Sequence, residues 1–256
     1  MDAHWLVPDW PAPANVRAVC TTRHGGVSLG RYDSLNLGDH VGDEPAHVAR
    51  NRALLCEAVG AQPVFLQQVH GTGVVALDAA QDVISDGTAA DACTATTAGL
   101  ACTIMVADCL PVLFTDAAGR RVAAAHAGWR GLAGGVLEQT LKSFGDAGAA
   151  GVIAWVGPCI GPKAFEVGAE VKAAFEAHAP EAASCFRAAP GSPPTAGKWL
   201  ADLPALARQR LRTAGVSSIH GNDGSDTWCT VGNPSRFFSH RRDGVSGRFA
   251  ALVWKA

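Results

Sequence analysis

The sequence has no apolar run long enough to cross a membrane, which takes about 18 consecutive apolar residues. Its most apolar stretch, residues 99–107, is far shorter and ends at Asp108. Residues 1–8 have no basic start followed by an apolar segment, so they do not resemble a secretory signal. We therefore expect a cytoplasmic protein without a membrane partner.

Clusters of like charge are also missing. The chain has 21 Lys and Arg residues against 23 Asp and Glu residues, for a formal net charge of -2. A protein that binds nucleic acid or a membrane surface is expected to gather basic residues into a patch. We therefore expect no nucleic-acid partner, whereas a small anionic ligand needs only a few local arginines.

The eight cysteines form no CxxC pair. A small secreted domain held together by disulfides would be shorter and would have cysteines at a higher density. Without a secretory signal, reduced thiols are the expectation. Most of them should then be buried like small hydrophobic residues, which leaves one or two for chemistry.

Strand-like and helix-like segments alternate along the 256 residues, 48% of which are hydrophobic, so the chain can bury a substantial core. The apolar pattern predicts strands at residues 16–22, 64–69, 74–77, 100–106, 112–115, 121–125, 152–156, 216–219 and 249–253. It predicts helices at residues 45–59, 131–144, 168–177 and 203–213 and a Pro- and Gly-rich loop at residues 188–197. This mixture favours an α/β or α+β domain and leaves the strand order open.

Three candidate metal ligands, His70, Cys109 and His126, lie at the ends of predicted strands. Imidazole and thiolate suit zinc or copper, and three protein ligands leave one coordination position open, as in catalytic zinc sites. Zinc can lower the pKa of a bound water to about 7, and a thiolate ligand weakens this effect because it donates charge to the metal. Their spacing matches no compact ligand motif, and a lone histidine at a strand end is more often structural. From the residues alone both interpretations stay open.

The segments around these three residues resemble the YfiH family, which is also called the laccase-domain or multi-copper polyphenol oxidoreductase family. The central segments are residues 67–71 (QQVHG), 107–113 (ADCLPVL) and 125–131 (AHAGWRG). Further similar segments are residues 21–28 (TTRHGGVS), 34–38 (SLNLG), 157–162 (GPCIGP) and 237–244 (FFSHRRDG). They follow the family's order and cover nearly the whole chain.

The resemblance implies a fold and a ligand set. It implies one α+β domain over residues 1–256, with layered mixed β-sheets flanked by helices and a relationship to cysteine hydrolases. Carried over residue by residue, the family's zinc ligands are His70, Cys109 and His126, with copper as the alternative metal. The family often has Tyr at the position of His240, so the role of that ring stays open.

Polar residues inside the similar segments are candidates for substrate binding. Arg23, Asn36 and Arg241 suit the ribose, base or phosphate of a nucleoside, although Arg241 and Arg242 would serve equally in ion pairs that close the fold. Arg130 begins a predicted helix, where backbone amides and an arginine together suit a phosphate, and a surface salt bridge is the alternative.

Two residues of the central segment are candidates for catalysis. Cys109 supplies a thiolate, and Asp108 suits an acid, a base or a group that orients a ligand, against the alternative of a turn carboxylate. For Cys159, a buried structural thiol is the favoured interpretation, and a second reactive thiol is the alternative. The remaining histidines with no ligand-like spacing, expected to be exposed or structural, are His24, His40, His47, His178 and His220.

Four functions follow as hypotheses. The resemblance implies phosphorolysis of adenosine, inosine, guanosine and methylthioadenosine together with adenosine deamination, with a nucleoside and phosphate as partners. Copper-dependent polyphenol oxidation is an alternative, but multi-copper clusters usually use His-x-His pairs, and no two of the nine histidines have that spacing. Hydrolytic editing of a peptidoglycan precursor and a non-enzymatic binding role are the others.

Overall fold

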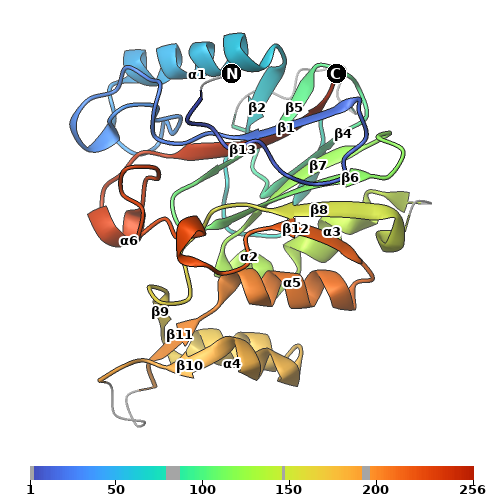
Figure 1. Cartoon of the computed structure of the whole chain (residues 1–256), viewed down its shortest axis with the longest axis vertical. Coiled ribbons are helices and arrows are strands. Elements are labelled where there is room, and N and C mark those ends of the chain that lie inside the picture. The colour runs from blue at the N-terminus through green and yellow to red at the C-terminus, as the bar shows by residue number, and fades with distance from the viewer. Residues whose placement is uncertain (1–2, 79–86, 146–147, 192–196) are drawn as a thin grey trace.

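Two β-sheets stacked face to face form the centre of the molecule, and helices cover their outer faces (Figure 1). The computed structural model describes residues 3–78, 87–145, 148–191 and 197–256. The four-stranded sheet contains, in spatial order, β1 (Val16–Cys20), β13 (Phe249–Lys255), β5 (Leu100–Val106) and β2 (Gln62–Phe65). Its strands pair antiparallel except for β2, which runs parallel to β5.

The second central sheet is mixed as well. Its six strands, in spatial order, are β12 (Ser218–Gly221), β8 (Val152–Val156), β6 (Leu110–Asp116), β7 (Val122–Ala127), β4 (Ala92–Ala95) and β3 (Val74–Ala76). The outermost pairs are parallel and the inner pairs antiparallel. A small third sheet contains β10 (Phe186–Ala188), β11 (Trp199–Ala201) and β9 (Glu166–Val167).

The helices form the outer layers. Helix α1 (Pro45–Val59) covers the four-stranded sheet. The helices on the side of the six-stranded sheet are α2 (Trp129–Gly134), α3 (Val136–Lys142), α4 (Ala169–Glu176) and α5 (Leu203–Thr213). A short helix, α6 (His240–Asp243), precedes the last strand.

Alternating side chains build the core on both faces of the sheets, as the period of two in a strand requires. In β13, Phe249, Ala251 and Val253 belong to the core between the two sheets, whereas Ala250 and Leu252 belong to the core under α1. Strand β7 divides its alanines in the same way between the inter-sheet core and the helical layer. The fold is therefore an α+β arrangement of layered mixed sheets flanked by helices, as predicted.

Several predicted elements are confirmed, and others differ for local reasons. Helix α1 has the predicted bounds and ends at Gly60, whose φ of 66° is left-handed. The single helix predicted at residues 131–144 is two helices, because the chain turns at Gly135 with a φ of 97°. Strand β4 was not predicted because it is short and buried on both faces, so it lacks the polar alternation that marks a half-buried strand.

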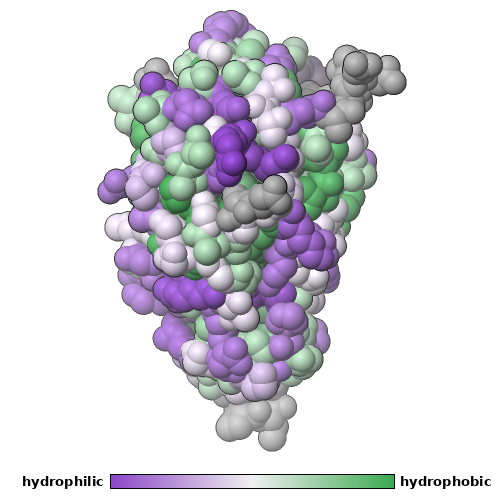
Figure 2. Space-filling model, turned by 90° about the vertical axis from the view of Figure 1, so that its right-hand side faces the viewer, coloured by the Kyte–Doolittle hydropathy of each residue, from purple (hydrophilic) through white to green (hydrophobic). Residues whose placement is uncertain are grey.

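Polar and apolar residues are interspersed on the face of the molecule that Figure 2 draws. Among the described residues, none of the helices combines the length and the apolar character that a membrane span requires.

The predicted loop at residues 188–197 joins β10 to β11, and its residues 192–196 lie outside the described part of the chain.

The substitution Ile104→Ala should destabilise the protein strongly, since Ile104 is 0% exposed in the core between the sheets. We expect the free energy of unfolding to fall by about 2–5 kcal/mol, measured by urea denaturation. Leu29→Ala is the matched control, because Leu29 is 72% exposed and should change it little. Similar small losses for both variants would contradict the inter-sheet packing described here.

Candidate active site

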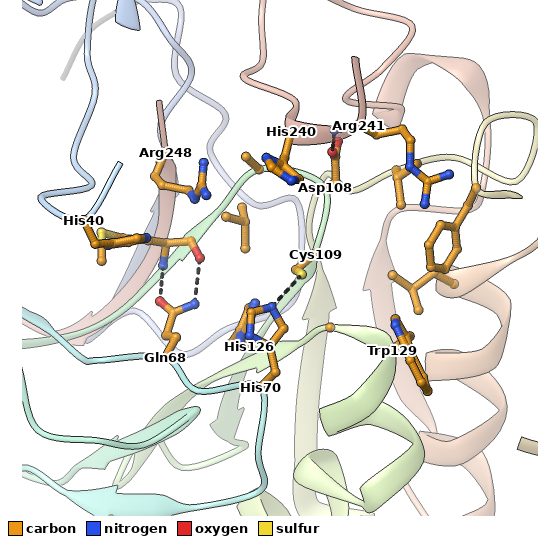
Figure 3. Close-up of a pocket in the computed structure, with 17 residues that line it drawn as sticks. His40, Gln68, His70, Asp108, Cys109, His126, Trp129, His240, Arg241 and Arg248 are labelled. Carbon is orange, nitrogen blue, oxygen red and sulfur yellow. Dashed lines mark hydrogen bonds between the residues drawn. The ribbon is translucent and has the colours of Figure 1, made fainter. Parts of the chain in front are cut away.

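The three predicted metal ligands meet where the chain passes from one central sheet to the other. His70 lies in the loop after β2, Cys109 in the turn between β5 and β6, and His126 near the end of β7. Their ligand atoms all lie within 4.8 Å of one another, and Cys109 Sγ is 3.8 Å from His70 Nε2 (Figure 3). Residues from both sheets thus form one group that can hold a metal ion.

The backbone beside this group adopts conformations that side chains rarely take. His70 has a φ of 61° and Asp108 a φ of 90°, both in the left-handed region. Such conformations cost about 1–3 kcal/mol each and concentrate at functional sites, where the surrounding structure holds them in place. Here they turn the chain sharply at His70 itself and directly before Cys109.

Two glycines of the segment 125–131 are required by close approach. A Cβ on Gly128 would lie 3.0 Å from both Cys109 Sγ and the His70 ring, and 3.7 Å from the His126 ring. A Cβ on Gly131 would lie 2.7 Å from the carbonyl oxygen of Gly71. Only glycine at these positions lets the start of α2 pack against the ligand group.

A buried carboxylate that sequence reasoning missed, Asp91, ties two of the ligands together. Its Oδ1 accepts hydrogen bonds from His126 Nδ1 at 2.8 Å and from the His70 backbone amide at 2.9 Å. Its Oδ2 accepts one from the Gly71 amide at 2.6 Å. The hydrogen bond at Nδ1 leaves Nε2 of His126 to face the ligand group.

These hydrogen bonds decide the charge of Asp91. Burial by itself would raise the pKa of the Asp91 carboxyl. The hydrogen bond from His126 and those from the backbone amides outweigh it and hold this pKa below its usual value. Asp91 is therefore an anion that is 0% exposed and fully engaged by its neighbours.

The Cys109 thiol is activated by the two histidines. Burial opposes ionisation, but the charge and hydrogen bonding of His126, and then of His70, lower the pKa of Cys109 to about 6. Burial likewise opposes the charge on His126, yet Cys109 and Asp91 raise its pKa to about 9. Without a metal the pair is thus a thiolate beside an imidazolium, and the thiolate is the form that binds metals.

The donor set fits a single transition metal ion. Two imidazoles and one thiolate are typical ligands of zinc or copper, and three protein ligands leave a coordination position open. His126 is buried, Cys109 half-buried and His70 exposed, so the group is open on one side. Among the described residues, this is the one group of three or more His, Cys, Asp or Glu side chains arranged to hold a metal ion.

The open side of the group faces a cavity of about 450 Å³ (Figure 3). Polar and cationic residues of its wall, on one side of the ligands, include His40, Gln68 and Arg248. Apolar residues that line it include Trp129, Ile160, Phe165 and Leu203. In Figure 3, Trp129 and Arg248 lie on opposite sides of Cys109. The cavity therefore has two ends with the ligand group between them: an apolar end, at which Arg241 also lies, and a cationic end that contains Arg248.

The side chain of Gln68 braces the loop that bears His70. Its Oε1 accepts a hydrogen bond from the Met105 amide, and its Nε2 donates one to the Met105 carbonyl, both at 2.8 Å (Figure 3). This pairing attaches the loop to β5. Gln68 belongs to the similar segment 67–71, so the sequence contained a signal for it.

Asp108 lies in the cavity wall, as its predicted role requires. Its Oδ1 accepts a hydrogen bond from Thr230 Oγ1 at 2.5 Å, and its Oδ2 accepts one from the Arg241 amide at 2.6 Å. The carboxylate thus anchors the start of α6 against the turn that bears Cys109. A role for Asp108 as an acid or base stays a prediction.

Of the four predicted substrate ligands, Arg241 lines the cavity and the others do not. Arg23 donates hydrogen bonds to the carbonyls of Asp33 and Pro234 at 2.7 and 2.9 Å. Arg130 is exposed and stacks on Trp129, with its guanidinium carbon 4.5 Å from the ring centroid. Arg130 thus supports a residue of the cavity wall from outside.

Asn36 is completely buried and acts on the cavity through its neighbours. Its Oδ1 accepts hydrogen bonds from the amides of Gly38 and Arg248 at 2.9 and 2.8 Å, and its Nδ2 donates to Asp43 Oδ2 at 2.9 Å. Asn36 therefore positions Arg248, a cavity residue that lies outside all the similar segments and that the sequence did not single out.

Three further residues compare with their predictions as follows. Cys159 is buried, as expected, and burial raises the pKa of its thiol well above the usual value. His40 is exposed, as expected, but it lines the cavity, which its spacing did not indicate. His240 also lines the cavity, at the start of α6.

Comparison with known proteins adds the family. A family model described as multi-copper polyphenol oxidoreductase laccase matches residues 17–256. The chain belongs to this laccase-domain, or YfiH, family. A protein named purine nucleoside phosphorylase from Pseudomonas aeruginosa is 52% identical, with 98% of each chain covered. Another, purine nucleoside phosphorylase YfiH from Escherichia coli, is 48% identical over 97% of this chain and 98% of its own.

Two solved structures share the fold. A Neisseria meningitidis protein is 50% identical, covers 98% of this chain and 99% of its own, and superposes with a TM-score of 0.90. A Bacillus licheniformis YfiH protein is 28% identical, with 94% and 93% covered and a TM-score of 0.83. The relationship to cysteine hydrolases stays a prediction.

The substitution Asp91→Asn should weaken metal binding by about 10-fold to 100-fold, because it replaces the anion that orients His126 with a neutral amide. The affinity is measured by competition with a chromophoric chelator. Asp116→Asn is the matched control, since Asp116 is a buried carboxylate that accepts hydrogen bonds from Arg120 in the β6–β7 turn. An unchanged affinity in the Asp91 variant would show that the carboxylate does not act on the ligands.

In the metal-free protein, alkylation of Cys109 should follow a titration with a midpoint near pH 6. The rate rises with pH because only the thiolate reacts, and it levels off well below the range of an ordinary thiol. Measuring iodoacetamide labelling of Cys109 by mass spectrometry between pH 5 and pH 10 tests this. The variant His126→Gln should shift the midpoint upward, and an identical profile would exclude His126 as the cause.

Proposed function

We propose that the chain is a metal-dependent purine nucleoside phosphorylase that acts on adenosine, inosine, guanosine and methylthioadenosine. The observation that carries the proposal is the ligand group of His70, Cys109 and His126, which opens into a cavity with an apolar end and a cationic end. Relatives that bear this enzyme name match almost the whole chain at 45–52% identity. A purine nucleoside and a phosphate need these two environments side by side.

Zinc is the metal we propose, with His70, Cys109 and His126 as its ligands. When bound, zinc supplies a Lewis acid that stabilises negative charge on an oxygen and lowers the pKa of a bound water to about 7. The protein's part is orientation: Asp91 fixes the His126 ring, and Gly128 admits α2 close to all three ligands. With one such group among the described residues, a cluster of several copper ions has no support.

The apolar end of the cavity suits the purine. Trp129 and Phe165 offer aromatic faces, and Ile160 and Leu203 exclude water around them. In phosphorolysis, a phosphate oxygen forms a bond to the anomeric carbon, while the bond from that carbon to the base nitrogen breaks and its electron pair leaves with the base. The base then needs a proton. Both oxygens of Asp108 in the cavity wall accept hydrogen bonds, so our candidate role for Asp108 is a relay that takes a proton from solvent and passes it to the base.

Adenosine deamination belongs to the same proposal. It replaces the amino group at C6 of adenine with an oxygen from water and releases ammonia. The apolar end of the cavity would hold the adenine ring for this reaction as well.

All eight cysteines are free thiols, which supports the cytoplasm as the compartment.

A second candidate, hydrolysis of an amide such as that of a peptidoglycan precursor, is favoured by one observation. Asp91 orients His126, which in turn lowers the pKa of Cys109, and a Cys–His–Asp series of this kind serves nucleophilic catalysis. In that case Cys109 would attack a carbonyl carbon without a metal. Chelation would then preserve activity, and phosphate would be dispensable.

Purified zinc-loaded protein should convert inosine and phosphate to hypoxanthine and ribose 1-phosphate. A coupled assay for each product measures the reaction. Cys109→Ala and His70→Ala should lower kcat/KM by about 100-fold or more, because each removes a proposed metal ligand. His178→Ala is the matched control, since His178 is exposed at the end of α4, away from the cavity.

Phosphate dependence separates the candidates. Cleavage of inosine that is equally fast without phosphate would contradict phosphorolysis. Failure of the zinc-loaded protein to cleave any of the four nucleosides, together with turnover of an amide precursor after chelation, would establish the hydrolase instead.

A further inference from the structure

Arg248 is a half-buried cation in the cavity wall, on the same side of the ligand group as His40 (Figure 3). It directly precedes β13, and its backbone amide donates a hydrogen bond to the buried Asn36 at 2.8 Å. Its side chain packs over Gly38, where a Cβ would lie 2.8 Å from Arg248 Cγ. The arginine is therefore held in place from its backbone to its side-chain stem.

The guanidinium of Arg248 lacks a carboxylate partner within the described part of the chain. Its Nη1 donates hydrogen bonds to the carbonyls of Ser246 and Gly247 at 2.9 and 3.1 Å. None of the ion pairs among the described residues includes it. By contrast, the buried Arg210 pairs with Glu138 at 2.7 Å, the usual arrangement for a desolvated charge.

Burial without a counter-ion has an electrostatic cost at this position. Burial lowers the pKa of Arg248, and the nearby negative charges of Cys109 and Asp108 offset this only in part. Both oxygens of Asp108 already accept hydrogen bonds from Thr230 and Arg241. A metal would also neutralise the Cys109 thiolate and leave a net positive ligand group.

The other cavity arginine has a different environment. Arg241 is exposed, donates a hydrogen bond from Nη1 to the Glu166 carbonyl at 3.0 Å, and lies 5.6 Å from the centroid of the Phe165 ring. In Figure 3 it lies on the side of Trp129, opposite Arg248. It therefore belongs with the apolar end of the cavity.

We propose that Arg248 forms the subsite for inorganic phosphate, a tetrahedral oxyanion that supplies the negative counter-charge which Arg248 lacks, with His40, which also pairs with Asp39 at 3.3 Å, at the edge of this subsite. This assignment rests on the proposed function. A guanidinium binds such an anion through two parallel N–H···O hydrogen bonds. With phosphate at Arg248 and the purine against Trp129 and Phe165, the sugar lies beside His70, Cys109 and His126.

Isothermal titration of the zinc-loaded protein with inorganic phosphate, in chloride buffer and without nucleoside, tests the subsite directly. Arg248→Gln should weaken phosphate binding by about 10-fold to 100-fold, the loss expected for charged hydrogen bonds. Arg248→Lys keeps the charge but loses the two-point geometry, so its affinity for phosphate should lie between those of the unsubstituted protein and of Arg248→Gln. His40→Gln should cause a smaller loss, and Arg212→Gln, exposed on α5, should cause none.

Steady-state kinetics give a second measurement. Arg248→Gln should raise KM for phosphate by a similar factor while KM for inosine changes by less than about 3-fold. An unchanged affinity for phosphate, or an equal rise in both KM values, would overturn the subsite. Binding of a nucleoside monophosphate but not of inorganic phosphate at Arg248 would also overturn it.

The subsite and the proposed function fail in distinguishable ways. Phosphate binding that depends on Arg248, in a protein that cleaves none of the nucleosides, would retain the subsite and reject the phosphorylase. Phosphorolysis that is insensitive to both Arg248 substitutions would retain the phosphorylase and reject the subsite. Should Arg248→Gln fail to fold, judged by circular dichroism, Arg248→Lys and His40→Gln still decide.

Discussion

The site depends on one buried interaction, the set of hydrogen bonds that converge on the Asp91 carboxylate. Asp91 directly precedes β4 in the six-stranded sheet, yet it holds the backbone of His70 and Gly71, which follow a strand of the other sheet. It also orients His126 on the neighbouring strand β7. A buried carboxylate is stable only with such partners, so the same contacts that satisfy its charge also fix the ligand geometry.

The sequence was informative where local rules act and silent where distant segments meet. Helix α1 could be predicted because Pro45 and Gly60 mark its ends, and the long apolar strands because of their length. The strand order and the two-sheet stacking could not, since pairing such as that of β1 with β13 joins residues more than 200 positions apart. Short strands such as β4 have too few residues to establish a period.

The same division holds for the site. His70, Cys109 and His126 were singled out because their residue types suit a metal and their segments resemble a family. Arg23 and Asn36 carry equally strong motifs, yet their side chains hydrogen-bond to backbone groups and do not themselves line the cavity. Asp91 and Arg248 matter through three-dimensional contacts that no spacing reveals. The one local signal for Asp91 was its position between two alanines, Ala90 and Ala92, because a carboxylate in an apolar segment needs buried hydrogen-bond partners.

The turn that carries Cys109 joins the last residues of β5 in one sheet to the first of β6 in the other. A metal bound by His70, Cys109 and His126 would therefore link the two central sheets to each other. By mass action, such an ion raises the ratio of folded to unfolded chain by a factor of one plus the free metal concentration divided by the dissociation constant of the metal. A fall in the free metal concentration would then lower the folded fraction of the chain as well as the occupancy of the site.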